Sequence, residues 1–135
     1  MCLSPVSDSI AVNSFNCRGL RETRKRKAIF NWLKSKFEGI TLLQETHSCI
    51  EDEVTWPKDW EGQIFLSHGT TNSRGVAILI PTKLSSKIHI IQATADDSGR
   101  ILILNCKIEG NPLLLINIYA PTKDNISRIK ITRIY

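Results

Sequence analysis

The first third of the chain combines two short apolar segments with one amphipathic segment, and this order limits the fold more than any other feature. Residues 9–15 are apolar and β-branched enough for a strand, and Gly19 marks the turn that ends it. Residues 21–37 place apolar side chains on one helical stripe and Lys and Arg on the other, with Gly39 just past the expected end. Residues 40–44 are apolar nearly throughout. A strand, a helix and a strand at this spacing predict a βαβ-like unit whose two strands lie in one sheet.

The rest of the chain reads as short strands separated by Gly and Pro. Expected strands lie at about 63–67, 75–80, 86–94, 100–108 and 112–119. The acidic, Trp-rich segment 50–60 is expected to be a loop that can contain a short helix. Gly110 followed by Asn111-Pro112 predicts a tight hairpin, and residues 113–118 suit a central strand covered on both faces. The tail at 122–135 fits a helix and a strand equally well.

Length and composition indicate one α/β domain over residues 1–135, with 41% hydrophobic and 23% charged residues. No apolar run reaches the roughly 18 residues of a membrane-spanning helix, and residues 1–9 do not resemble a secretory signal. We therefore expect an intracellular protein, nuclear or cytoplasmic, with no membrane partner. The four scattered cysteines include no CxxC pair, which argues against zinc and for free thiols. The formal charge of +5 favours acidic partners such as nucleic acid.

Three polar side chains are expected at strand ends, where ligands collect in open α/β sheets. Glu45 directly follows a buried strand, and Asn16 lies just past the first strand. If those strands are neighbours, the carboxylate and the amide meet at one rim, where they suit a hard cation such as Mg²⁺. Tyr119 ends the last clear strand, where its phenol could hydrogen-bond a phosphate oxygen.

Five short motifs occur in one order along the chain. They are Asn16–Leu20 (NCRGL), Gln44–His47 (QETH), Ser73–Leu79 (SRGVAIL), Asp97–Arg100 (DSGR) and Asn117–Pro121 (NIYAP). Each motif is unspecific alone, but their joint order and the elements between them are far more specific. Over about residues 8–122 the chain resembles the DNase I-like endonuclease/exonuclease/phosphatase family, and within it the endonuclease of LINE-type retrotransposons.

The resemblance implies a four-layered α/β sandwich, in which two packed mixed sheets are flanked by helices. It implies cleavage of phosphodiesters with a divalent metal, usually Mg²⁺, and double-stranded DNA as the substrate. By motif match, Glu45 would ligate the metal with Asn16 beside it, and Tyr119 would contact the phosphate. In the retrotransposon branch the nick would supply a primer for reverse transcription, which requires further domains.

The family site also contains a Gly-Asp-Phe-Asn-like segment, a later Asp and a Ser-Asp-His-like segment, all downstream of the Tyr-Ala-Pro motif. A chain that stops at Tyr135 does not reach them. We therefore expect an incomplete sandwich with its C-terminal half missing, which does not cleave DNA alone and self-associates through exposed sheet surface. His47, His68 and His89 are expected to be structural or superficial rather than the missing base.

A basic run crowds the start of the predicted helix. Its members are Arg21, Arg24, Lys25, Arg26 and Lys27. One interpretation is a phosphate-contacting or nuclear-import patch, and the other is a solvated helix face. Expected nucleic-acid contacts are Arg18, Arg24, Lys25 and Arg74. Two alternatives to an endonuclease fragment stay open: a non-catalytic nucleic-acid-binding remnant, and a decayed retroelement reading frame with no role.

Overall fold

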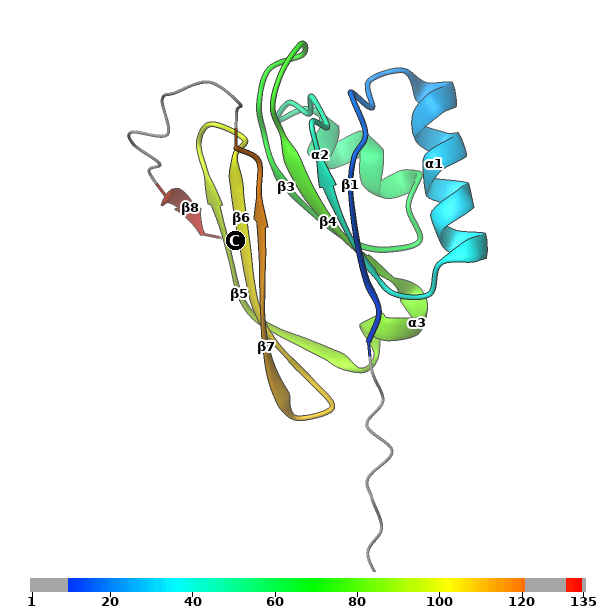
Figure 1. The fold of residues 1–135 in the computed structure, drawn as a ribbon, viewed down its shortest axis with the longest axis vertical. Helices are drawn as coiled ribbons and strands as arrows, with labels where there is room; N and C mark the ends of the chain where they lie inside the picture. Colours follow the sequence, from blue (N-terminus) through cyan, green and yellow to red (C-terminus); the bar gives the residue numbers. More distant parts are fainter. Residues whose placement is uncertain (1–9, 121–130, 135) are drawn as a thin grey trace, which may run out of the picture.

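The computed structural model describes residues 10–120 and the backbone of 131–134, and it consists of two four-stranded sheets with helices beside the first (Figure 1). In chain order the elements are β1 (Val12–Asn16), α1 (Thr23–Lys36), β2 (Ile40–Gln44), α2 (Asp52–Thr55), the 3-10 helix η1 (Trp56–Lys58), β3 (Gly62–Ser67), β4 (Val76–Pro81), α3 (Thr82–Ser85), β5 (Ile88–Asp96), β6 (Ile101–Ile108), β7 (Asn111–Ile118) and β8 (Ile131–Ile134). The predicted α/β class is confirmed.

The first sheet has the order β1-β2-β4-β3 and contains the predicted βαβ unit. β1 and β2 pair in parallel, with Val12 opposite Ile40 and Asn16 opposite Gln44, while β2–β4 and β4–β3 are antiparallel. Helix α1 covers the outer face of this sheet (Figure 1). Its buried Phe30 and Leu33 join a cluster with the strand residue Leu43. Burying each such side chain contributes about 1.5–3 kcal/mol.

The second sheet has the order β7-β6-β5-β8, and all its pairings are antiparallel. The prediction of mixed sheets is therefore correct for the first sheet and wrong for the second. The inner faces of the two sheets enclose a second cluster, which includes Ile78 of β4 and Leu102 and Leu104 of β6. The described residues thus form three layers, helices, first sheet and second sheet, of the four that were expected.

The predicted hairpin lies between β6 and β7. Ile108 pairs with Asn111 across a two-residue turn in which Glu109 and Gly110 have φ of 49° and 85°. Positive φ at both turn residues is the geometry that fits the twist of a two-residue hairpin. The structure therefore places the turn at Glu109-Gly110, two residues before Asn111-Pro112, with which β7 begins.

The expectation that residues 113–118 form a central strand covered on both faces is wrong. Within the described part of the chain, β7 is an edge strand whose one neighbour is β6. Its inner face buries Leu115, but Leu114, Ile116 and Ile118 on its outer face are 58%, 47% and 53% exposed. An uninterrupted apolar run does not distinguish a strand covered on both faces from a strand covered on one face. The run contains apolar residues that point inward in both kinds of strand.

Two further expectations are settled by local geometry. Segment 50–60 contains the short helices α2 and η1, whereas α3, from Thr82 to Ser85, was not predicted. The strand alternative for the tail is right for Ile131–Ile134, and residues 121–130 lie outside the described part. None of the described helices has the length and apolar character needed to cross a membrane.

Candidate metal and phosphate site

The predicted site residues stand at the carboxyl ends of strands. Asn16 is the last residue of β1 and pairs with Gln44, the last residue of β2, so Glu45 follows at the same rim. Tyr119 comes directly after β7 and approaches this rim from the second sheet. The adjacency of Asn16 and Glu45 follows from the parallel β1–β2 pairing, because the carboxyl ends of parallel neighbours meet at one edge.

The side chains of Asn16 and Tyr119 lie close enough to the Glu45 carboxylate for hydrogen bonding from both to lower its pKa. The Asn16 Oδ1 atom accepts a hydrogen bond from the backbone N–H of Arg18 at 2.9 Å, which leaves the amide Nδ2 to donate to the carboxylate. Glu45 and Tyr119 are half-buried and Asn16 is exposed. The structure therefore brings the three groups together at an open rim, within reach of a ligand.

The surroundings of Glu45 favour its ionised form. The hydrogen bond from Asn16 lowers the pKa of the carboxyl most, burial opposes this, and the Tyr119 hydroxyl and the charges of His47 and Arg18 lower the pKa further. The hydrogen bond to Glu45 raises the pKa of the Tyr119 phenol, so this residue stays a neutral donor at physiological pH. An ionised carboxylate at an open rim suits Mg²⁺, and the Asn16 amide beside it can orient that carboxylate.

The number of acidic groups at the rim also limits the kind of metal that fits. Among the described residues no group of three or more His, Cys, Asp or Glu side chains could hold a metal ion. A closed structural zinc centre, which needs four protein ligands, does not fit that donor set. Mg²⁺ does, because it is commonly held by one or two carboxylates and keeps several waters.

Interlocked loops hold the rim in place. The backbone N–H of Gly19 donates to the Glu45 carbonyl at 2.6 Å, and that of His47 donates to the Arg74 carbonyl at 2.8 Å. Each of these loops contains a non-glycine residue in the left-handed region: Arg18, Glu45, His47 and Arg74 have φ of 52°, 55°, 58° and 61°. Such residues cost on the order of 1–3 kcal/mol each and cluster at functional sites.

Two glycines make this close packing feasible. A Cβ atom on Gly75 would lie 2.3 Å from the Thr46 Oγ1 atom, and one on Gly19 would lie 2.7 Å from the His47 Nδ1 atom. Both glycines also have positive φ, of 90° and 88°. The glycines of the motifs are therefore required by contacts between the loops that surround Glu45.

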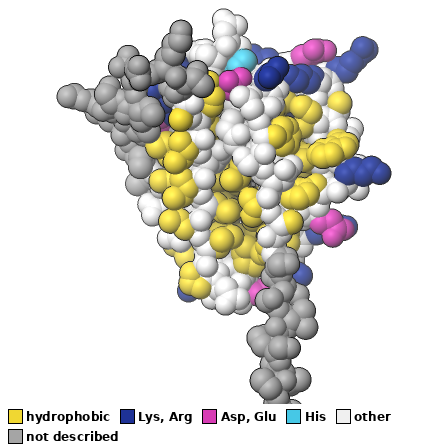
Figure 2. Space-filling model, in the orientation of Figure 1, with side chains coloured by type: hydrophobic (Ala, Val, Ile, Leu, Met, Phe, Trp, Pro, Cys, Tyr) yellow, Lys and Arg dark blue, Asp and Glu magenta, His cyan; other side chains and the backbone are white. Residues whose placement is uncertain are grey.

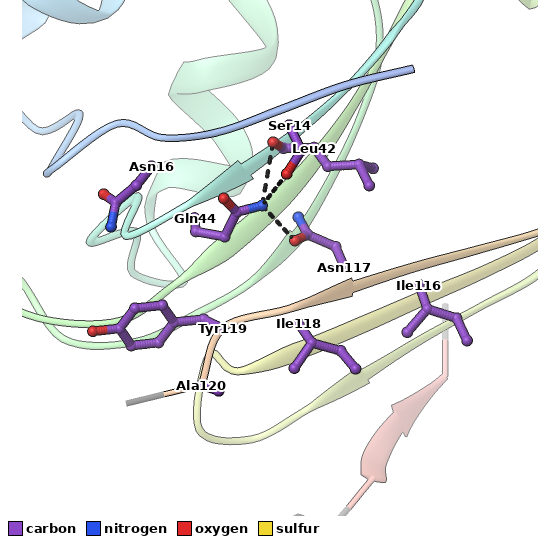
Figure 3. A pocket seen from close by; sticks show the side chains of 9 residues that line it. All are labelled: Ser14, Asn16, Leu42, Gln44, Ile116, Asn117, Ile118, Tyr119 and Ala120. Carbon is purple, nitrogen blue, oxygen red and sulfur yellow. Dashed lines mark hydrogen bonds between the residues drawn. The ribbon is translucent and has the colours of Figure 1, made fainter. Parts of the chain in front are cut away.

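Asn117 joins the two sheets below the rim (Figure 3). Its Nδ2 atom donates to the Leu43 carbonyl at 3.0 Å and to the Ala77 carbonyl at 2.8 Å, and its Oδ1 atom accepts from Gln44 Nε2 at 2.8 Å. This buried amide ties β7 to β2 and β4, and so fixes Tyr119, two residues on, relative to Glu45. Sequence analysis placed Asn117 in the NIYAP motif but gave its side chain no role.

A groove of about 570 Å³ runs between β1 and β7, with Asn16 and Tyr119 at the same end of it (Figure 3). The groove is lined by residues of both sheets, among them Ser14, Leu42 and Ile116. It exists because β1 and β7 are the edge strands on this side of the two sheets. The rim and the groove are therefore continuous.

The basic run divides into two groups. Arg21 forms an ion pair with Asp52 at 2.7 Å, and the buried Arg26 pairs with Asp59 at 3.1 Å and lies over the Trp56 ring. These two arginines are structural. Arg24 is exposed, whereas the Lys25 ammonium donates to the Arg18 carbonyl at 3.0 Å, beside the Glu45 rim.

Arg18 and Arg74 are the other two residues that were expected to contact nucleic acid. Arg18 is exposed beside Glu45, and Arg74 is half-buried in the neighbouring loop. Of the predicted contact residues, Arg18 and Lys25 touch one another and Arg74 joins their loop network, while Arg24 stands apart on the helix surface. Arg18 and Lys25 thus bring positive charge near the Glu45 carboxylate, whereas Arg74 joins the loops through its backbone carbonyl.

The three histidines occupy different surroundings. The His47 ring packs against Gly19. The His68 ring lies between the Ser48 hydroxyl at 2.9 Å and a Glu53 carboxylate oxygen at 2.7 Å, and burial lowers the pKa of its imidazole. Ser48 in this relay is fully buried, so it has no access to a substrate. His89 is exposed on β5.

Sequence analysis also missed Asp96, although the DSGR motif follows it. Its carboxylate accepts hydrogen bonds from the Ser67 and Ser98 hydroxyls and from the backbone N–H groups of Arg100 and Ile101, the last two at 3.0 Å. Burial raises the pKa of Asp96, but these hydrogen bonds outweigh it and lower the pKa below its ordinary value. Asp96 therefore organises the β5–β6 turn that carries Arg100.

The cysteines of the described chain are free thiols, as predicted for Cys17, Cys49 and Cys106. Cys17 is buried next to the rim, where its thiol donates to the Gln44 carbonyl at 3.1 Å. Burial raises the pKa of this thiol to about 11, so it stays protonated and inert. Cys2 lies outside the described residues.

No family model matches the chain. The chain is 31% identical over 114 residues to the transposon TX1 uncharacterized 149 kDa protein of Xenopus laevis. The similarity covers 84% of this chain and 9% of that protein, so the chain spans about a tenth of the length of the relative it matches.

Proposed function

We propose that this chain is part of a metal-dependent, phosphodiester-cleaving endonuclease of retrotransposon type, DNase I-like in fold. The observation that carries the proposal is the contact of Asn16 and Tyr119 with Glu45 at the end of parallel strands, inside motifs of that family. The similarity over 114 residues to a transposon protein supports the same origin. DNA is the proposed partner, and the nucleus or cytoplasm the proposed location.

The roles of the residues follow from their chemistry. Glu45 and Asn16 would hold Mg²⁺, which supplies charge neutralisation at a phosphate when bound. The Tyr119 phenol, which lies beside Glu45 here, would donate to a phosphate oxygen, and Arg18, Lys25, Arg74 and the more distant Arg24 would contact the backbone. A positioned general base contributes about 10²–10⁴-fold to such reactions, and we assign that role to none of the described residues. For this reason we propose that the chain alone binds DNA without cutting it.

The test is DNA binding and plasmid nicking by the purified chain, with and without Mg²⁺. We expect binding whose log affinity falls with log salt, and weaker Mg²⁺-dependent binding in Glu45→Gln. Glu109→Gln is the matched control, because that exposed carboxylate lies in the distant β6–β7 turn. Nicking of supercoiled plasmid that Glu45→Ala abolishes would show instead that the chain is an active endonuclease.

Three cations on helix α1 and on the loop after β1 favour a second candidate, a non-catalytic nucleic-acid-binding remnant. Arg18, Lys25 and Arg24 make no ion pair with an acidic side chain among the described residues. This candidate predicts salt-dependent DNA binding that is unchanged by Mg²⁺ and by Glu45→Gln. Affinity that is flat with salt would exclude both candidates and leave the decayed reading frame.

A further inference from the structure

Arg100 lies directly across the β6–β7 ladder from Tyr119. The Tyr119 backbone N–H donates to the Arg100 carbonyl at 2.8 Å, which continues the pairing one step beyond Ile101 and Ile118. In an antiparallel pair, opposite residues project from the same face of the sheet. Leu102 and Asn117, the next residues on that face, are buried between the sheets, so Arg100 and Tyr119 share the inner face at its rim end.

The guanidinium of Arg100 has an unused donor. Its Nε atom is buried and has no hydrogen-bond partner among the residues that the structure describes. The carboxylate of Asp96 is taken by hydroxyls and backbone N–H groups, including that of Arg100 itself at 3.0 Å. A buried donor without an acceptor is costly, which indicates that an acceptor arrives with a ligand.

The identity of that acceptor follows from the geometry of the guanidinium and its neighbours. A planar fork of N–H donors matches two oxygens of a phosphate better than it matches a single neutral acceptor. The adjacent Tyr119 offers a hydroxyl to the same space, and Glu45 beyond it repels a ligand carboxylate or phosphate unless a cation lies between. An anion that engages this rim is therefore one that can bridge a guanidinium, a phenol and a bound cation.

We propose that Arg100 is a phosphate-binding residue that holds a non-bridging oxygen of a nucleic-acid phosphodiester next to Tyr119. This inference rests on the proposed function, because it names the contact that Arg100 makes with the same substrate. It adds a cation from the second sheet to a set that otherwise comes from helix α1 and from the loops of the first sheet. The phosphate would thereby be held from both sheets.

The experiment has two arms, both with the full chain. In the first, DNA affinity is measured in a salt series for wild type, Arg100→Gln, Arg100→Lys and the control Lys36→Gln. Lys36 is exposed at the far end of α1 and carries the same charge. Loss of one phosphate contact lowers the slope of log affinity against log salt by about 0.9. We expect that change for Arg100→Gln and an unchanged slope for Lys36→Gln.

In the second arm, the Nε–Hε resonance of Arg100 is followed by ¹⁵N NMR as inorganic phosphate is added. Arg100→Lys, which keeps the charge but lacks Nε, identifies the resonance. We expect a downfield shift that saturates with phosphate and does not occur with chloride. Circular dichroism of each variant separates loss of binding from loss of folding.

The outcomes separate the two proposals. If wild type binds DNA and Arg100→Gln keeps its full salt slope, Arg100 is not a phosphate contact and the proposed function is unaffected. If DNA does not bind but phosphate shifts the Arg100 resonance, the contact is supported and DNA as the partner is refuted. If neither effect occurs, both proposals are overturned.

Discussion

Replacing Asn117 by alanine should weaken the connection between the two sheets more than any exposed substitution on β7. The variant loses three hydrogen bonds, to Leu43, Ala77 and Gln44. It leaves two buried carbonyls without this donor, while the half-buried Gln44 amide keeps Ser14 and Leu42 as acceptors. A buried polar group left unpaired costs about 1–3 kcal/mol. We take about 1 kcal/mol for each carbonyl, because these oxygens can accept elsewhere, and expect a total loss of about 2 kcal/mol.

The assay is urea unfolding at equilibrium, followed by the fluorescence of the buried Trp56 and Trp60. Asn105→Ala on the outer face of β6 is the matched control, since that side chain is exposed, and we expect it to change stability by less than about 0.5 kcal/mol. Asn117→Asp should be at least as harmful as Asn117→Ala, because a carboxylate cannot donate to the two carbonyls. A loss below about 1 kcal/mol in Asn117→Ala would refute the role of this amide as the link between the sheets.

Two other substitutions test features on either side of the second sheet. The lowered pKa of Asp96 means that its ionised form stabilises the fold above the ordinary carboxyl pKa near 3.9, and that this contribution is lost as the pH falls through the lower, folded-state pKa. Asp96→Asn should therefore be less stable than wild type at neutral pH, and its unfolding free energy should fall less steeply below about pH 4. Equal slopes of unfolding free energy against pH for the two proteins would contradict this. Ile116→Lys adds a charge to the exposed apolar face of β7, which is visible as a band of apolar side chains in Figure 2. Light scattering should show wild type associating with rising concentration and Ile116→Lys remaining smaller, while a sharp wild-type monomer at high concentration would exclude self-association through this face.

The parts of the fold that sequence analysis predicted well depend on local periodicity. The helix over α1 and the strand Ile40–Gln44 follow from apolar spacing, and their order implies the parallel β1–β2 pair. That pairing in turn brings Asn16 beside Glu45. The site could be expected from the sequence to this extent because strand direction alone determines which residues share a rim.

The features that were missed depend on contacts between distant segments. Arg21 and Arg26 resembled their neighbours in the basic run, but their acidic partners lie 31 and 33 residues away in the chain. Asn117 bonds carbonyls 74 and 40 residues away, which no local pattern indicates. The same holds for the outer face of β7, whose exposure depends on which elements pack over the sheet.

The claim that Glu45, Asn16 and Tyr119 form a cation site is tested most directly by NMR of the ¹⁵N-labelled chain with added Mn²⁺, a paramagnetic substitute for Mg²⁺. We expect selective broadening of the backbone signals of these three residues and their loops, relieved by excess Mg²⁺ and absent in Glu45→Gln. Uniform broadening, or broadening centred on other carboxylates, would show that these three residues do not form a cation site.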